Sequence, residues 1–231
     1  MLDKLVLYIP FLYPNEKEFF DVLDVLSESN IEYLELGVPV KDANMDGPLI
    51  KEAHSKVLEQ GFNKEKLIET LEIIREKYSF KIILMTYIEG VEKYLLNSLS
   101  EDLYDGILCV DEIIERHVNP KVLQVYPPNL SEDRINFLLE NNILFSYVIS
   151  GEGKTGTFNA LPNEYIDTIE YIKRKSSLPT FVGFGIKTPE DVNEVMQNGA
   201  DGAIIGTEFM KRFQDGNLEG VKSYLKEFKT D

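Results

Sequence analysis

Two carboxylates frame the stretch of this sequence with the clearest chemical potential. Residues 34–48 read LELGVPVKDANMDGP, with Glu35 inside an apolar run and Asp46 eleven positions later, just before Gly47-Pro48. An acid flanked by two leucines is costly to bury unless it has a partner or a chemical task. Burial also raises the pKa of a carboxyl group toward the range in which it can transfer protons near neutral pH. The pair therefore indicates acid–base chemistry, although structural ion pairs occur at similar places.

Two glycine-containing loops near the C-terminal end are a second candidate site. Residues 183–189 read GFGIKTP and residues 204–207 read IIGT, and each follows or ends an apolar run. Glycine lets the backbone approach an anion closely, and backbone N–H groups at a helix start bind phosphate. The pair predicts a phosphate site, and the simpler alternative is that the glycines only relieve crowding.

Composition excludes several classes of function. The chain has 231 residues and a formal net charge of −16, with 40 acidic residues against 24 Lys and Arg, which argues against binding nucleic acid or anionic membranes. It has one cysteine and two histidines, so we expect no intrachain disulfide, no metal and a reduced, cytoplasmic setting. We see no signal peptide or membrane span in the sequence.

Short apolar runs that alternate with helical patterns must position these groups. Strands are predicted at residues 5–12, 32–38, 80–87, 106–110, 121–126, 144–150, 180–186 and 202–206. Helical spacing or capping residues mark helices between them: at residues 19–26, at 49–60, after Asn63, around Tyr94 and Leu95, after Ser131, at 166–172, from Thr188 to Gly199 and at 218–225. We expect about two helical turns at 111–117 and a mobile loop at 151–160.

Eight strands alternating with helices, in a chain close to about 250 residues, predict one (β/α)8 TIM barrel over residues 1–231. A doubly wound open sheet stays possible, because alternation alone does not prove closure. In a barrel the carboxyl ends of all the strands meet at one rim, so Glu35, Asp46 and Tyr147 would face the same site.

Four ordered blocks carry a resemblance to a known family. They are LELGVPVKDANMDGP with LIKEAHSKVLEQG, then SYVISGEGKTG, FVGFGIKTPEDV and NGADGAIIGT. Together they resemble the α subunit of tryptophan synthase. The resemblance implies a cytoplasmic TIM-barrel lyase of tryptophan biosynthesis that cleaves indole-3-glycerol phosphate by a retro-aldol reaction, without metal or organic cofactor. It also implies a tryptophan synthase β subunit as partner, in an α2β2 heterotetramer.

The resemblance assigns roles to particular residues. Glu35 would be the acid–base group, Asp46 would accept the indole N–H, and Tyr147 would position Glu35 or the glycerol hydroxyls. The phosphate-binding residues it implies are Gly156, Gly185, Gly206 and Thr207. The indole pocket and the lid over the substrate would be formed by Phe11, Tyr87, Leu108, Thr155 and Phe184.

The sequence departs from the family at two loops. PVKDA at residues 39–43 replaces PFSDP, and Gly151-Glu152 replaces an Arg-Ser pair. The sequence therefore does not fix the affinity for the β subunit. One alternative function is that of a subunit with a weakened site that mainly activates its partner. Another phosphate-binding barrel isomerase or lyase is a further alternative. An indoleglycerol-phosphate synthase is less favoured, because it needs a catalytic lysine that these strand ends do not carry.

Overall fold

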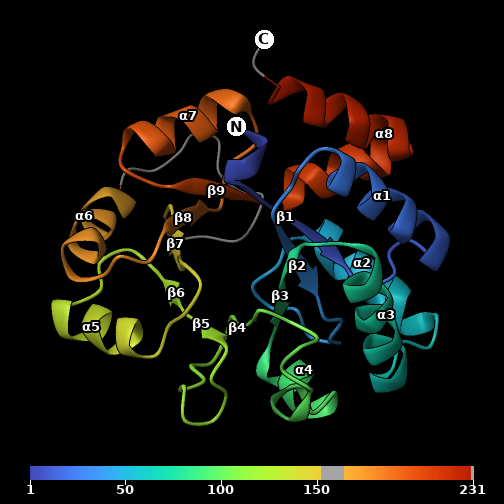
Figure 1. The fold of residues 1–231 in the computed structure, drawn as a ribbon, viewed down its shortest axis with the longest axis horizontal. Helices are drawn as coiled ribbons and strands as arrows, with labels where there is room; N and C mark the ends of the chain where they lie inside the picture. The colour runs from blue at the N-terminus through green and yellow to red at the C-terminus, as the bar shows by residue number, and fades with distance from the viewer. Residues whose placement is uncertain (152–163, 230–231) are drawn as a thin grey trace.

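A single, entirely parallel sheet forms the centre of the molecule. The computed structural model describes residues 1–151 and 164–229. The sheet order is β5-β4-β3-β2-β1-β9-β8-β7-β6, so its two outer strands are consecutive in the chain. Figure 1 shows the strands gathered in a ring with the helices arranged around them. The prediction of a (β/α)8 TIM barrel is confirmed.

The observed strands lie within the predicted ranges. They are β1 (Leu5–Pro10), β2 (Tyr33–Gly37), β3 (Lys81–Thr86), β4 (Gly106–Cys109), β5 (Val122–Leu123), β6 (Val125–Tyr126), β7 (Ser146–Ile149), β8 (Thr180–Gly183) and β9 (Gly202–Ile205). The strand predicted at residues 121–126 forms two short strands in the structure. Its first half, β5, pairs with β4, and its second half, β6, pairs with β7.

Gln124 is the residue at which this strand changes partner. Its backbone N–H donates to the Asn142 side chain at 2.8 Å, and its side-chain amide donates to the carbonyls of Ile114 and Asn141 at 2.7 and 2.8 Å. These bonds satisfy the Gln124 N–H and the two carbonyls without a strand partner. They lie where the two ends of the sheet approach each other.

The helices cover the outside of the sheet. They are α1 (Glu16–Glu28), α2 (Pro48–Glu59), α3 (Lys64–Lys77), α4 (Ile88–Lys93), α5 (Glu132–Glu140), α6 (Tyr165–Lys175), α7 (Pro189–Gln197) and α8 (Thr207–Glu227), with short 3-10 turns η1 (Leu2–Lys4) and η2 (Leu96–Ser98). Asn63, Ser131 and Thr188 cap α3, α5 and α7 through their side chains, as predicted. α8 contains a kink at Asn217, where φ is 50°.

Two helical predictions need correction. The helix expected around Tyr94 and Leu95 ends at Lys93, because the Tyr94 hydroxyl is tied to the Pro39 carbonyl at 2.8 Å and Leu95 adopts a left-handed φ of 52°. The two turns expected at residues 111–117 form bends and a turn and no helix. There the Asp111 carboxylate accepts the Ile88 N–H at 2.8 Å, which fixes the start of the segment to α4.

Apolar side chains fill the barrel from both sides of the sheet. One cluster inside the ring is built from alternate strand residues such as Val6, Ile83, Leu108 and Ile204, and a larger one lies between the sheet and the helices. Side chains alternate between the two faces along each strand, so the strands are buried on both sides. No helix in the described residues is long and apolar enough to cross a membrane.

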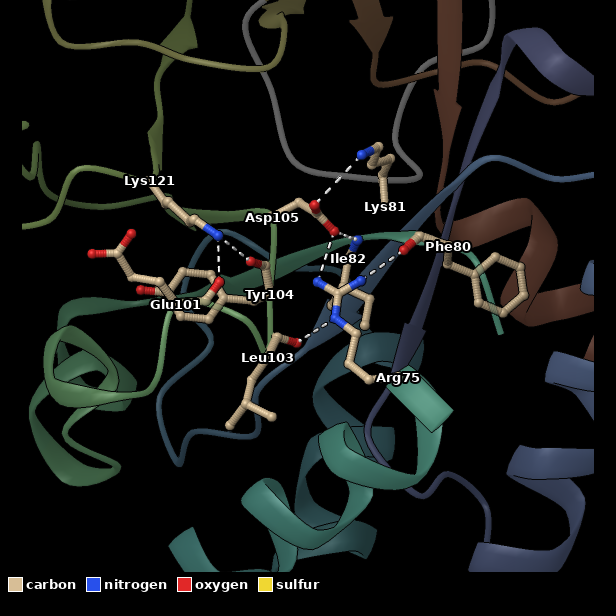
Figure 2. A network of polar contacts seen from close by, with 9 residues as sticks. All are labelled: Arg75, Phe80, Lys81, Ile82, Glu101, Leu103, Tyr104, Asp105 and Lys121. Atoms are coloured by element: carbon tan, nitrogen blue, oxygen red, sulfur yellow. Dashed lines mark hydrogen bonds and ion pairs between the residues drawn. The ribbon is translucent and has the colours of Figure 1, made fainter. Parts of the chain in front are cut away.

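A polar network fastens the end of the barrel where the strands begin (Figure 2). Arg75, at the end of α3, donates to the Asp105 carboxylate at 2.7 Å and to the carbonyls of Phe80 and Leu103 at 2.9 and 3.1 Å. Asp105 also accepts the Ile82 N–H at 2.9 Å. The network thus ties α3 to the starts of β3 and β4, at the opposite end of the strands from the carboxylates.

Candidate active site

The carboxyl ends of the strands surround a cavity of about 310 Å³, a volume suited to a small-molecule ligand. Its walls come from β1, β2, β3, β7, β9, the loops after β2 and β8, and the first turns of α2 and α8. The lining residues are Tyr8, Glu35, Asp46, Ile50, Met85, Tyr147, Phe184, Gly185, Ile186, Lys187, Ile204, Gly206, Thr207, Glu208 and Lys211. The structure therefore brings together residues that are up to 203 positions apart, on the rim that the barrel prediction requires.

Glu35 projects from β2 and is only 2% exposed. Its Oε1 atom is buried and has no hydrogen-bond partner among the described residues. Burial, and then the charge of Asp46, raise the pKa of Glu35 to about 8. The carboxyl group is therefore protonated at neutral pH and can both give and take a proton near that pH.

Asp46 is held by hydrogen bonds at the end of the loop after β2. Its Oδ2 atom accepts the Tyr87 hydroxyl at 2.8 Å, and that hydroxyl accepts the Met45 N–H at 3.1 Å. The Glu89 carboxylate accepts the N–H groups of Lys41 and Asp42 at 3.2 and 3.3 Å, so the loop is also tied to α4. Asp46 is thus a carboxylate in a fixed position that shares the cavity with Glu35.

Tyr147 lines the cavity from β7. Its ring packs over Gly183, where an added Cβ would lie 2.7 Å from the Tyr147 hydroxyl oxygen. Burial, followed by the charges of Glu35 and Asp46, raises the pKa of Tyr147 well above its usual value. Its hydroxyl group keeps its proton and can act as a hydrogen-bond donor inside the cavity.

The part of the cavity formed by the loop after β8 and the start of α8, here called the anion end, is suited to an anion. Phe184 and Gly185 both have positive φ values, 72° and 77°, after β8, and the Ser150 hydroxyl donates to the Phe184 carbonyl at 2.7 Å. Gly206 and Thr207 follow β9 and begin α8. The Thr207 hydroxyl oxygen is buried with no partner in the described part of the chain. A helix N-terminus with a spare hydroxyl is a phosphate-binding arrangement.

The residues predicted for the indole pocket do not all lie at the cavity. Leu108 lines a small, mostly apolar recess that shares Asp46, Met85, Tyr147 and Phe184 with the cavity. Tyr87 reaches the site through its bond to Asp46.

Phe11 does not line the cavity, because it is directed outward and packs against Phe19 and Phe62, with ring centroids 6.5 and 5.5 Å away. Thr155 and Gly156 lie outside the described residues, as does the expected loop from residue 152 onward.

Several residues at or near the cavity were not predicted, and those with polar side chains matter most for the chemistry. Tyr8 lies two positions after the inward-facing Val6, a period-2 signal that could have identified it. Lys187 and Lys211 bring positive charge to the anion end, and His54 touches Tyr8 from α2. No cluster of three or more His, Cys, Asp or Glu suited to a metal occurs among the residues that the structure describes.

Comparison with known proteins gives a consistent result. The family model for the tryptophan synthase alpha chain matches residues 2–231. The tryptophan synthase alpha chain of Prochlorococcus marinus is 33% identical over 98% of this chain and 86% of its own length. The alpha chain of Thermotoga petrophila is 32% identical over 94% of this chain and 92% of its own.

Solved structures show the same fold. A mutant tryptophan synthase alpha-subunit from Pyrococcus furiosus superimposes with a TM-score of 0.83 at 23% identity, covering 97% of each chain. Tryptophan synthase from M. tuberculosis, in its aminoacrylate-bound form, gives a TM-score of 0.82 at 23% identity over 97% of this chain and 91% of that chain.

Proposed function

Because this chain belongs to the tryptophan synthase alpha chain family, whose members are lyases of tryptophan biosynthesis, we propose that Glu35 and Asp46 cleave indole-3-glycerol phosphate in its cavity. The observation that carries the proposal is the buried Glu35 carboxyl group. Its Oε1 atom has no hydrogen-bond partner among the described residues, and it shares with Asp46 a cavity that reaches the start of α8. A proton-transfer group, a fixed carboxylate and an anion site are the three components that the reaction needs.

The first step is protonation of the indole ring. Protonated Glu35 gives its proton to C3 of the indole, and the ring becomes a cation with the positive charge centred on its N–H. Asp46 accepts that N–H and stabilises the charge as it develops, because its position is already set by Tyr87. General acid–base catalysis of this type contributes roughly 10²–10⁴-fold to a rate.

The second step breaks the carbon–carbon bond. Glu35, now a carboxylate, removes the proton from the glycerol hydroxyl next to the ring, and that carbon becomes the aldehyde carbonyl. The electron pair of the broken bond returns to the ring and restores neutral indole. The products are indole and glyceraldehyde 3-phosphate, and Glu35 ends protonated, as it began. Tyr147 lies beside both carboxylates and is assigned to positioning the reacting groups.

We place the phosphate group at the anion end of the cavity. The backbone at Gly185, Gly206 and Thr207, the Thr207 hydroxyl and the positive charge of Lys187 and Lys211 support this assignment. Binding energy gained there holds the substrate while the reacting bonds are several atoms away. We assign Gly156 and Thr155 to the same substrate only on the resemblance of their segment.

We also propose a tryptophan synthase β subunit as the partner and the cytoplasm as the location. The partner would dock on the rim, where Met45 is exposed on the loop after β2. The α2β2 stoichiometry is a prediction from the family.

The test is indole release from indole-3-glycerol phosphate by the isolated chain, repeated with the cognate β subunit. Release by the isolated chain, abolished by Glu35→Gln, is the expected result. A chain that releases no indole alone or with its partner, yet activates the β subunit, would instead be the weakened subunit considered above. No indole release and no β activation would remove the proposal.

A further inference from the structure

A buried tyrosine–histidine pair lies at the cavity wall and has no part in the mechanism above. The Tyr8 hydroxyl oxygen is 2.9 Å from Nε2 of His54, and the Val40 N–H donates to Nδ1 of the same ring at 3.4 Å. Tyr8 and His54 are both only 2% exposed. Tyr8 comes from β1 and lines the cavity, whereas His54 comes from the middle of α2.

The hydrogen-bond network fixes which atom donates in this pair. A backbone N–H can only donate, so Nδ1 of His54 uses its lone pair to accept from Val40. Burial lowers the pKa of His54 to about 4, so its ring is neutral and carries its single hydrogen on Nε2. That N–H therefore donates to the Tyr8 oxygen. The hydrogen of the Tyr8 hydroxyl group is left for another acceptor.

The position of Tyr8 limits what that acceptor is. In the β1–β2 ladder Tyr8 is the partner of Glu35, so both side chains lie on one face of the sheet. The ring lies over Gly37, where an added Cβ would be 2.2 Å from the hydroxyl oxygen. On its other side Gly206 comes within van der Waals distance, since a Cβ there would be 3.6 Å from Cβ of Tyr8. Tyr8 thus lies between the acid–base group and the anion end.

We propose that Tyr8 binds the substrate through its hydroxyl group, by donating a hydrogen bond to the glycerol hydroxyl nearer the phosphate, and that His54 is its positioning residue. The inference rests on the proposed function. A substrate with its ring beside Glu35 and its phosphate beside Gly206 carries its two chain hydroxyls between them. Glu35 takes the proton of the one next to the ring, and Tyr8 holds the other.

The test uses two ligands that differ only in these hydroxyls. Indole-3-glycerol phosphate has both, and indole-3-propanol phosphate has the same ring and phosphate with neither. Tyr8→Phe should lower kcat/KM for the first by about three- to tenfold, the effect of one lost neutral hydrogen bond. It should leave the Kd of the second unchanged within about twofold, because the ring of residue 8 still packs over Gly37.

Tyr104→Phe is the matched control. Tyr104 is equally buried, its hydroxyl oxygen also accepts a side-chain N–H, from Asn119 at 3.1 Å, and it lies outside the cavity lining. This variant suffers the same loss of a buried acceptor and should change neither ligand constant. Thermal unfolding of both variants reports any effect on folding separately.

His54→Ala supplies a second, independent measurement. If His54 acts through Tyr8, the loss caused by Tyr8→Phe becomes smaller once His54 is already alanine. An equal weakening of both ligands by Tyr8→Phe, or full additivity of the two substitutions, overturns the inference. A wild-type chain that releases no indole would instead refute the proposed function, so the two failures are distinguishable.

Discussion

Glu35 carries an ionisable group between two leucines of a central strand, and this placement has a measurable catalytic consequence. Glu35→Gln keeps the size of the side chain and removes its ability to exchange protons. We expect at least a roughly 100-fold loss of indole formation, because general acid–base catalysis contributes about that much or more. Binding of indole-3-propanol phosphate should be retained. Activity within about threefold of wild type would show that another group transfers the protons.

The raised pKa of Glu35 also predicts how activity and stability depend on pH. The resting form that protonates C3 is the neutral acid, so kcat/KM should fall as the pH rises through about 8. The folded-state pKa lies above the unfolded value, so the contribution of Glu35 to stability is fully present below the unfolded pKa. It is lost as the pH rises through about 8.

Urea unfolding at pH 5 and pH 9 checks the stability half of this prediction. The free energy of unfolding of Glu35→Gln, relative to that of wild type, should be higher at pH 9 than at pH 5, since glutamine never ionises. If the wild-type protein loses no stability relative to the variant between pH 5 and pH 9, the carboxyl group of Glu35 titrates near its ordinary pKa in the folded state.

Asp46 acts at a different stage, and its variant should show a different kinetic signature. Asp46→Asn keeps a side-chain oxygen for the indole N–H but removes the charge that stabilises the ring cation. We therefore expect kcat to fall more than KM rises, because the charge develops mainly in the transition state. Steady-state kinetics on indole-3-glycerol phosphate measure this. A rise in KM alone would assign Asp46 to ground-state binding.

At the scale of elements, the groups proposed for catalysis and the polar network that ties the strands to α3 lie at opposite ends of the barrel. The carboxylates lie where the strands end, and the Arg75–Asp105 network lies where β3 and β4 begin (Figure 2). Burial alone would raise the pKa of Asp105, but hydrogen bonds from Arg75 and the Ile82 N–H bring the net value below normal. The contribution of this ionised group to stability is present above its unfolded pKa. It is lost as the pH falls through the lower folded value.

Asp105→Asn tests that separation. It should reduce the free energy of unfolding at pH 7 by about 1.5–3 kcal/mol, the range for hydrogen bonds to charged groups, and leave kcat/KM unchanged. The difference from wild type should shrink when unfolding is repeated at a pH below the folded pKa of Asp105. Lys81→Ala is the control, since Lys81 makes only a 3.7 Å contact with Asp105 and should cost little. A large loss of activity in Asp105→Asn without unfolding would contradict the division.

Sequence patterns located the elements better than they located contacts across the barrel. Hydrophobic runs and caps such as Asn63 and Thr188 are local signals, and the structure confirms them. The break at Gln124 depends on Asn141 and Asn142, residues that follow a helix and are brought there only by folding. The same holds for Phe11: its aromatic type fits a pocket, but its direction is set by Phe19 and Phe62.

At the site, the sequence predicted the polar groups at the strand ends but not the residues that hydrogen-bond to or surround them. Glu35, Asp46 and Tyr147 were predicted because barrel geometry and family blocks agree on their positions. The Tyr8–His54–Val40 network was not predicted, because it joins three elements through bonds that leave no spacing pattern in the chain. Lys211 lies one turn into α8, and only the direction of that helix brings it to the cavity.

At the scale of the whole molecule, the loop after β2 contributes both to the cavity and to the exposed rim. This predicts that binding of the ligand and binding of the partner are coupled. Its last residue, Asp46, lines the cavity, whereas the adjacent Met45 is 39% exposed on the rim proposed for the β subunit. The Tyr87 hydroxyl binds both, through the Asp46 carboxylate and the Met45 N–H. A ligand that binds Asp46 therefore also stabilises the arrangement of the surface that the partner would contact.

If the ligand and the β subunit favour the same arrangement of this loop, each must tighten the binding of the other by the same factor. We expect indole-3-propanol phosphate to lower the Kd of the subunit complex. The replacement of PFSDP by PVKDA should make the effect smaller than in relatives with the usual loop. Titration of this chain with its cognate β subunit, with and without the ligand, measures the factor. Tyr87→Phe, which removes the shared hydroxyl, should reduce it. An unchanged Kd in the presence of ligand would show that the loop does not couple the two sites, even where the lyase activity itself is found.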